Sequence, residues 1–417
     1  MIIRVGRALL LAGAALLLAA CAPPTLTQHG VWKQVASQPN GFVAESAFGL
    51  ADDRVLALGR GGVAIYDPTM NRWRPGAKLP GGVVPGIAAA LSDGRFFVTL
   101  HSLSGPDTGR AAIYDPNRDR WLDVPLMDVP RESESVTALR DGSVLLAGGY
   151  GPAGPSNPIG SAVRFDPAHG SWSPAGQLLL PRFGQVATLL ADGRVFILGG
   201  SDANQSQSQE VEIYDPTRNA WTDGGRLLIP SQAPQAIALR DGRVLELPGL
   251  DFLGAPIPVS ELYDPRSRSW EIGPQIPSPG GGPVVKLSDG RVMLLKASLN
   301  PTNPVFRAEI FDPQQMRWMA STVVAGEPGA VLATLHDRRV ITIGPTSSWI
   351  YDDSAALPPA PGETGIGSPQ TTLALGSIAG ILLLLVLIQY ALAIAGERRR
   401  IKLSSSLQPP AASAGSD

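Results

Sequence analysis

Residues 192–221 read DGRVFILGGSDANQSQSQEVEIYDPTRNAW, and this pattern of residues recurs along most of the chain. An Asp-Gly pair opens the stretch, an apolar run follows it, and an aromatic-Asp-Pro triplet begins at Tyr214. Asp-Gly between apolar runs is typical of a hairpin turn, because glycine adopts positive φ without a steric penalty. Asp-Pro is typical of a second turn, because proline presets φ and aspartate can bond the backbone nearby. The stretch therefore predicts short strands joined by tight turns.

The pattern repeats at intervals of about 49 residues, a period typical of propeller blades. The acidic turn pairs begin at Asp52, Asp93, Asp141, Asp192, Asp241, Asp289 and Asp337. The aromatic-Asp-Pro triplets begin at Tyr66, Tyr114, Phe165, Tyr214, Tyr263 and Phe311, and the tryptophans that follow each of them at a constant spacing are Trp73, Trp121, Trp172, Trp221, Trp270 and Trp318. No helical period is present, so each unit predicts four short strands. We expect the tyrosine and tryptophan rings to be buried between neighbouring blades.

The seventh unit is incomplete at its end, and the start of the chain supplies the missing part. Tyr351 is followed by two aspartates, but no tryptophan stands at the constant spacing. Trp32, within the strand pattern of residues 31–35, is the tryptophan that takes its place. We expect this N-terminal strand to become the outer strand of the last blade and to close the ring, which leaves no open pair of edges. Residues 30–354 then form seven blades; the alternative is six blades with stray ends.

The stretch 192–200, followed by Tyr214 and Trp221, resembles the kelch repeat. That repeat consists of a strand, a double glycine, a spaced tyrosine and a tryptophan. The resemblance covers residues 32–353 and implies an all-β, seven-bladed kelch-type β-propeller. Only two of the seven units keep both glycines, so the repeat is divergent. Kelch relatives include galactose oxidase-like copper enzymes, which use a cysteine-linked tyrosine. No cysteine lies inside this propeller, which argues against that chemistry.

The N-terminus has the charged-then-apolar order of a secretory signal. Arg4 and Arg7 precede an apolar run that ends in Leu-Ala-Ala before Cys21. This ending resembles the lipobox of bacterial lipoproteins, which implies a signal peptide over residues 1–20 and lipidation of Cys21. The alternative is an ordinary signal peptide with an incidental cysteine. We expect residues 21–29 to form a linker to the propeller.

The C-terminus predicts a second membrane anchor. Residues 372–396 are expected to form a transmembrane helix, since the apolar stretch from Leu373 to Ala395 is about 35 Å long as a helix, which is enough to cross a bilayer core. An Arg-Arg-Arg-Ile-Lys run starts at Arg398 and, by the positive-inside rule, places the tail 397–417 in the cytoplasm. The propeller would then be extracytoplasmic, in the periplasm or on the cell surface, behind a Pro/Gly-rich linker at 355–371. The alternative is that the C-terminal segment is a processed sorting tail.

The composition limits the classes of partner and cofactor. The formal net charge is -2 over 417 residues, so no basic field indicates nucleic acid. Cys21 is the only cysteine, which excludes an intrachain disulfide and a cysteine metal site. The four histidines show no metal-ligand spacing. We therefore expect no metal and no cofactor.

Strand order predicts two faces of the ring. The Asp-Gly and Asp-Pro turns lie on one face, here the turn face, and the longer, variable connections lie on the other, here the loop face. Variable loops on a rigid scaffold are the usual place for binding. We expect Arg131, Glu132, Glu134 and Arg182 to gather there at the mouth of the central channel, with both glutamates on one face of a regular strand. Two guanidinium groups would hold an anion or a sugar carboxylate. The alternative is that the four residues pair with one another on a solvated rim.

The sequence assigns no catalytic residue, and the fold alone does not give a function. We favour a non-catalytic, membrane-anchored module that binds a protein or a glycan at the cell envelope through the loop face. The alternative is a carbohydrate-active enzyme that uses the channel mouth. Some extracytoplasmic kelch proteins are similar to sialic acid mutarotases, and Arg131, Glu132 and Arg182 would suit acid–base chemistry of that kind.

Overall fold

The computed structural model describes residues 28–79, 81–104, 109–251, 253–277, 282–297, 305–325 and 329–354. The predicted signal peptide, Cys21, the C-terminal linker, the membrane helix at 372–396 and the basic tail lie outside these residues. No helix within the described ranges is long and apolar enough to span a bilayer. Every element found there is a β-strand, as the hairpin-rich repeat predicts.

The strands form seven blades of four, with one short extra strand. Blade 1 contains β3 (Val43–Gly49), β4 (Val55–Arg60), β5 (Gly62–Asp67) and β6 (Arg72–Pro75). Blade 2 contains β7 (Val83–Ala90), β8 (Phe96–Ser102), β9 (Arg110–Asp115) and β10 (Arg120–Asp123). Blade 3 contains β11 (Ser135–Ala138), β12 (Val144–Ala147), β13 (Ser161–Asp166) and β14 (Ser171–Gln177). Blade 4 contains β15 (Val186–Leu189), β16 (Val195–Leu198), β17 (Glu210–Asp215) and β18 (Ala220–Arg226).

The remaining blades follow the same order. Blade 5 contains β19 (Gln235–Ala238), β20 (Val244–Leu247), β21 (Val259–Asp264) and β22 (Ser269–Gln275). Blade 6 contains β23 (Val284–Lys286), β24 (Val292–Ala297), β25 (Val305–Asp312) and β26 (Arg317–Ala325). Blade 7 contains β27 (Val331–Thr334), β28 (Val340–Ile343), β29 (Ser348–Asp352) and the N-terminal β2 (Val31–Val35). The extra strand β1 (Gln28–His29) pairs in parallel with β26, so the predicted linker ends in a strand.

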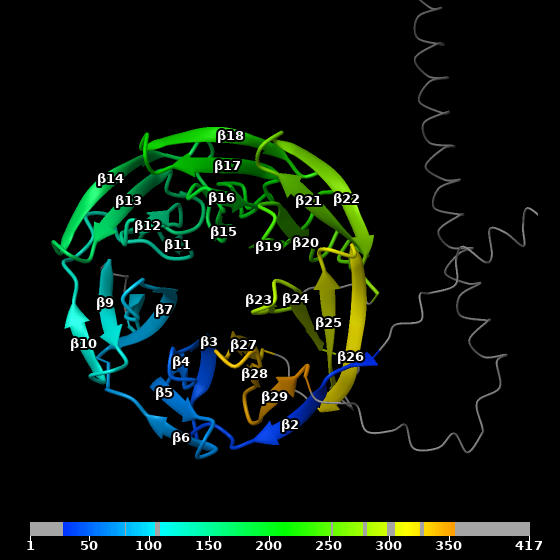
Figure 1. Ribbon diagram of the computed structural model, residues 1–417. Helices are drawn as coiled ribbons and strands as arrows, with labels where there is room; N and C mark the ends of the chain where they lie inside the picture. The colour runs from blue at the N-terminus through cyan, green and yellow to red at the C-terminus, as the bar shows by residue number, and fades with distance from the viewer. Residues whose placement is uncertain are drawn as a thin grey trace, which may run out of the picture. The chain divides into compact units, whose positions relative to one another are not determined.

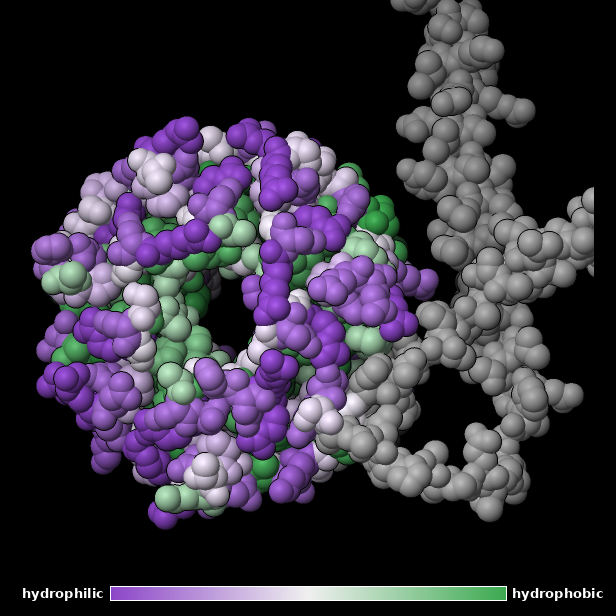
Figure 2. All heavy atoms as spheres, in the orientation of Figure 1, coloured by the Kyte–Doolittle hydropathy of each residue, from purple (hydrophilic) through white to green (hydrophobic). Residues whose placement is uncertain are grey.

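The blades stand around a central channel, with the first strand of each blade innermost and the fourth outermost (Figure 1). The space-filling view shows an opening at the centre of the ring, with apolar residues along part of its wall (Figure 2). All pairs within the blades are antiparallel, because each strand returns directly beside its predecessor through a short connection. The architecture confirms the predicted all-β, seven-bladed propeller.

The N-terminal strand closes the ring as predicted. β2 pairs antiparallel with β29, and Trp32 lies directly opposite Tyr351. Their ring centroids are 5.1 Å apart. Gln38, just after β2, is buried and accepts a hydrogen bond of 3.1 Å from the Ser348 hydroxyl. The first and last parts of the propeller therefore share one sheet and one buried polar contact.

The repeated aromatic residues hold neighbouring blades together, which confirms their predicted burial. Each aromatic of a triplet is almost fully buried and lies about 5 Å from the tryptophan of its own blade. In blades 1 to 4 the indole N–H also donates to a carbonyl of the preceding blade. These bonds are Trp73 to Ala36 (2.8 Å), Trp121 to Ala77 (3.1 Å), Trp172 to Pro125 (2.8 Å) and Trp221 to Ala175 (2.8 Å).

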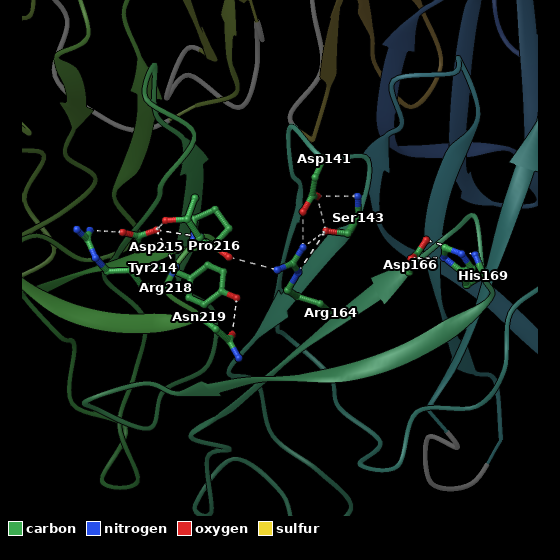
Figure 3. A network of polar contacts seen from close by, with 11 residues as sticks. Asp141, Ser143, Arg164, Asp166, His169, Tyr214, Asp215, Pro216, Arg218 and Asn219 are labelled. Carbon is green, nitrogen blue, oxygen red and sulfur yellow. Dashed lines mark hydrogen bonds and ion pairs between the residues drawn. The ribbon is translucent and has the colours of Figure 1, made fainter.

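A ring of seven arginine–aspartate pairs covers the turn face. In six blades the arginine follows the Asp-Gly or equivalent turn: Arg54–Asp52 (2.6 Å), Arg95–Asp93 (2.6 Å), Arg194–Asp192 (2.7 Å), Arg243–Asp241 (2.8 Å), Arg291–Asp289 (2.7 Å) and Arg339–Asp337 (2.6 Å). Blade 3 has Ser143 at that position, and Arg164 from β13 pairs with Asp141 instead. Arg164 also donates to the carbonyl of Pro216 in blade 4 (Figure 3). The pairs therefore order the turns and connect adjacent blades.

Candidate functional site

The loop face carries a small repeated ladder in blades 3, 4 and 5. In each of these blades, one isolated β-bridge joins a residue before the innermost strand to a residue near the start of the loop after the second strand, and a second bridge joins that loop residue to one near the end of the same loop. The three sets are Glu132–Tyr150–Pro158, Phe183–Ser201–Gln207 and Gln232–Leu250–Pro256. The ladders fix the bases of the variable loops, as expected for a rigid scaffold that presents them.

The structure places Arg131 and Arg182 inside their blades and not at the channel mouth. Their exposed fractions are 1% and 0%. Arg131 donates to the carbonyls of Gly148 (3.3 Å) and Ser161 (2.9 Å), which are the two ends of the loop after β12. Neither the predicted gathering at the mouth nor the alternative of a solvated rim is right, because the main chain takes up these donors. Ligand binding by the set of four residues stays a prediction.

Arg182 makes the same contacts in blade 4 and adds an ion pair. It donates to the carbonyls of Gly199 (3.1 Å) and Glu210 (2.7 Å) and to Oε1 of Glu212 (2.5 Å). Burial lowers the pKa of Arg182, and the negative charge of Glu212 raises it again. Glu212 also accepts the backbone N–H groups of Leu179 and Leu180, at 2.6 and 3.0 Å. This buried clamp fixes the loop after β16 and the connection between blades 3 and 4.

Glu132 and Glu134 do not share a strand face. Ser133 between them has a φ of 56°, and β11 begins only at Ser135, so the expected regular strand is interrupted. Glu132 is half-buried and accepts a bond of 3.1 Å from the Tyr150 hydroxyl. Glu134 turns inward instead, with an exposed fraction of 1%.

The Glu134 carboxyl group is buried near His101 and Thr99 of blade 2. Within the described ranges, neither of its oxygens has a hydrogen-bond partner. The Thr99 hydroxyl is close enough to lower the pKa of Glu134, but its well-formed bonds run to the main chain of Ile87. Burial is the dominant effect and raises the pKa of Glu134. In blade 4, Gln185 takes the equivalent position and donates to the Ala147 carbonyl at 2.6 Å. A neutral side chain therefore suits this position.

Exposed apolar side chains gather on the loop face of blades 2 to 5. Seven of the exposed large apolar residues lie in its connections: Leu103, Leu126, Val129, Leu179, Leu228, Leu250 and Leu253. We call these seven residues the apolar arc. On the turn face, Met70 is the exposed large apolar residue that the described turns contain. Apolar exposure of this kind, concentrated on one face, is typical of an interaction surface.

Two hollows lie on the turn face, opposite the face where we expected a site. Their volumes are about 480 and 450 Å³, and they lie between blades 5 and 6 and between blades 3 and 4. Asp–Arg pairs line both, including Asp289–Arg291 and Asp192–Arg194. Arg240 and Arg140, which also line the two hollows, donate to carbonyls of the next blade, which suits a role in joining blades. Among the described residues, no group of three or more His, Cys, Asp or Glu could hold a metal ion.

The repeat is similar in sequence to known kelch proteins. A family model described as the kelch motif matches residues 182–227, from Arg182 through blade 4. The chain is also 30% identical over 124 residues to Kelch-like protein 21 of Danio rerio, which is 29% of this chain and 19% of that protein. The seven-bladed propeller therefore contains a kelch motif in blade 4. It matches only about a fifth of the length of this curated relative.

A solved structure is similar to this chain in fold. It is a fungal alcohol oxidase of the AA5 family, in complex with copper, with a TM-score of 0.60. The likeness covers 78% of this chain and 77% of that one at 15% sequence identity. At this level of identity the comparison shows a common fold and nothing about the reaction.

The repeat pattern in the sequence did not identify Glu212 as the partner of Arg182. A glutamate stands two residues before the triplet aromatic in three successive blades, as Glu212, Glu261 and Glu309. All three are buried, and two face a cation of their own blade. The signal was present as a repeated Glu-x-aromatic spacing, but the spacing alone does not show which cation the carboxylate meets.

Proposed function

We propose that this kelch propeller is a protein-binding module whose loop face receives the partner. The observation that carries the proposal is the apolar arc, because the exposed large apolar side chains of the described connections lie mainly on one face, which favours a protein partner there. The ladders of blades 3 to 5 hold the loops in place, so little order has to be gained on binding. Kelch-like relatives are consistent with a protein partner.

Two substitutions in the apolar arc test this assignment. The double variant Leu228→Asp with Leu253→Asp is expected to weaken partner binding at least tenfold, because an interface would bury two unpaired carboxylates. Met70→Asp is the matched control, since Met70 is 73% exposed on the opposite face. Partners are crosslinked in intact cells, recovered with each variant and quantified. Equal recovery by all variants would place the partner elsewhere and overturn the proposal.

A glycan is the second candidate for the loop face. Tyr150 and Phe183 form a half-buried, edge-to-face pair with centroids 5.4 Å apart, and Glu132 accepts from the tyrosine hydroxyl. Aromatic rings beside a carboxylate can bind sugars. In the same experiment, a loss caused by Tyr150→Ala and not by the arc variant would favour a glycan. We do not favour the mutarotase-like alternative with Arg131, Glu132 and Arg182, because the two arginines are buried.

We also propose that two anchors hold the propeller on the outer side of a membrane, with the C-terminal tail in the cytoplasm. The lipobox-like sequence at Cys21 and the apolar stretch 372–396 support it. Cys21→Ser alone, or removal of residues 372–417 alone, is expected to leave the protein in the membrane fraction. The two changes together are expected to release it. A combined variant that stays membrane-bound would contradict the anchors proposed here.

A further inference from the structure

Three neighbouring blades bury a glutamate at the same position of their third strand, and two of them supply a cation to it. In blade 4, Arg182 pairs with Glu212 at 2.5 Å. In blade 6, Lys296 comes from β24 and its Nζ lies 3.7 Å from Glu309. The cation therefore comes from a different element in each case, while the carboxylate stays in place. This substitution within one chain indicates that the position needs a positive charge.

Blade 5 keeps the carboxylate but supplies no cation. Ser231 stands where blade 4 has Arg182, and its hydroxyl accepts a bond of 3.1 Å from the Gly249 N–H. Within the described ranges, no Lys, Arg or His side chain pairs with Glu261. Glu261 accepts the N–H groups of Leu228 and Ile229, at 2.9 and 2.6 Å, as Glu212 does with its own neighbours. In blade 4 the equivalent carboxylate also accepts a hydrogen bond from Arg182, and Glu261 has no such cationic donor among the described residues.

A second buried carboxyl group in blade 5 also lacks a cationic partner among the described residues. Glu246 of β20 lies directly opposite Glu261 in the ladder, where blade 4 has Ile197. Both glutamates are 1% exposed, and Oε1 of Glu246 has no hydrogen-bond partner among the described residues. Burial, and then the charge of Glu261, hold the pKa of Glu246 well above its usual range. A cation between these two adjacent, buried carboxyl groups would compensate the negative charge of both.

We propose that blade 5 binds a hard divalent cation, of which Ca²⁺ is the type, between Glu246 and Glu261. The ion takes the place that the Arg182 guanidinium occupies in blade 4. The carbonyls equivalent to those that Arg182 bonds are Pro248 and Val259, and no side chain of the described residues donates to either. Two carboxylates with carbonyl and hydroxyl oxygens are the donor set that Ca²⁺ prefers.

Calcium titration of the full-length protein, freed of metal with a chelator, tests the proposal. Millimolar CaCl₂ is expected to raise Tm by about 3 °C when the ion is in hundredfold excess over its dissociation constant. The increase is expected to become smaller in acid, because protons compete with the ion for the same carboxyl oxygens.

Three variants make the result specific. Glu246→Gln is expected to lose the calcium shift, and Ser231→Arg is expected to replace the ion with a guanidinium and to become insensitive to CaCl₂. Glu271→Gln, an exposed carboxylate of the same blade, is the matched control and is expected to keep the full shift. No calcium shift in the unaltered protein, or the same shift in Ser231→Arg, would overturn the proposal. A Tm that responds only to acid and loses this response in Glu246→Gln would also overturn it, because the pair would then share a proton.

Discussion

Trp32→Ala is expected to lower the free energy of unfolding by about 3 kcal/mol, the lower end for a large aromatic, because Trp32 is only half-buried. Trp32 lies opposite Tyr351 with ring centroids 5.1 Å apart, and β2 is the strand that joins the two ends of the propeller. The substitution therefore removes a contact between the two strands that close the ring, and the stability of the whole propeller depends on this closure. Chemical denaturation of the full-length protein measures the loss.

A control on the same strand separates ring closure from general damage. Lys33 lies on β2 with its side chain exposed, so Lys33→Ala is expected to change the free energy of unfolding by less than about 0.5 kcal/mol. Trp32→Phe keeps a ring against Tyr351 and is expected to recover part of the loss. If Trp32→Ala were no more harmful than Lys33→Ala, closure by the N-terminal strand would contribute nothing to stability.

Arg182→Met is expected to lower the free energy of unfolding by about 3–5 kcal/mol, because it leaves the buried Glu212 without its cation. The guanidinium also holds the two ends of the loop after β16, so the loop is expected to become more protease-sensitive. The double variant Arg182→Met with Glu212→Leu is expected to recover much of the loss, since no unpaired charge then remains buried.

An exposed ion pair in the same blade provides the comparison. Arg226 and Glu210 lie 3.0 Å apart with side chains 63% and 39% exposed. Arg226→Met is expected to cost less than about 1 kcal/mol, because water already solvates both groups. Urea denaturation measures each variant, and the single variant Glu212→Leu completes the double-mutant cycle of Arg182 and Glu212. Equal costs for Arg182→Met and Arg226→Met would show that the buried clamp does not stabilise blade 4.

Blade number and closure could be predicted from the sequence because both depend on local, repeated chemistry. Asp-Gly and Asp-Pro select their turns wherever they occur, and the constant spacing from the triplet aromatic to the tryptophan places both rings on one hairpin. The absent tryptophan after Tyr351 and the surplus Trp32 then identify the closing strand. None of these inferences requires knowledge of what lies beyond the neighbouring strand.

The candidate site could not be predicted in the same way. Arg131 and Arg182 follow prolines on the loop face, which suggested solvent exposure, but the tertiary structure closes the loops after β12 and β16 over both guanidinium groups. The direction of Glu134 depends on the backbone of Ser133, whose φ of 56° interrupts the strand. Charge and spacing identify which residues are unusual, and packing determines whether they face a ligand or the core.

The turns, the blades and the aromatic seams of this propeller are encoded locally, since a hairpin needs only its own residues to form. Strand register and loop closure determine which charges are buried and which carboxyl groups lie opposite each other in blade 5. They also determine which face exposes its leucine side chains to solvent. Those features arise only when segments distant in sequence pack together, because burial is a property of the assembled ring and not of any single repeat.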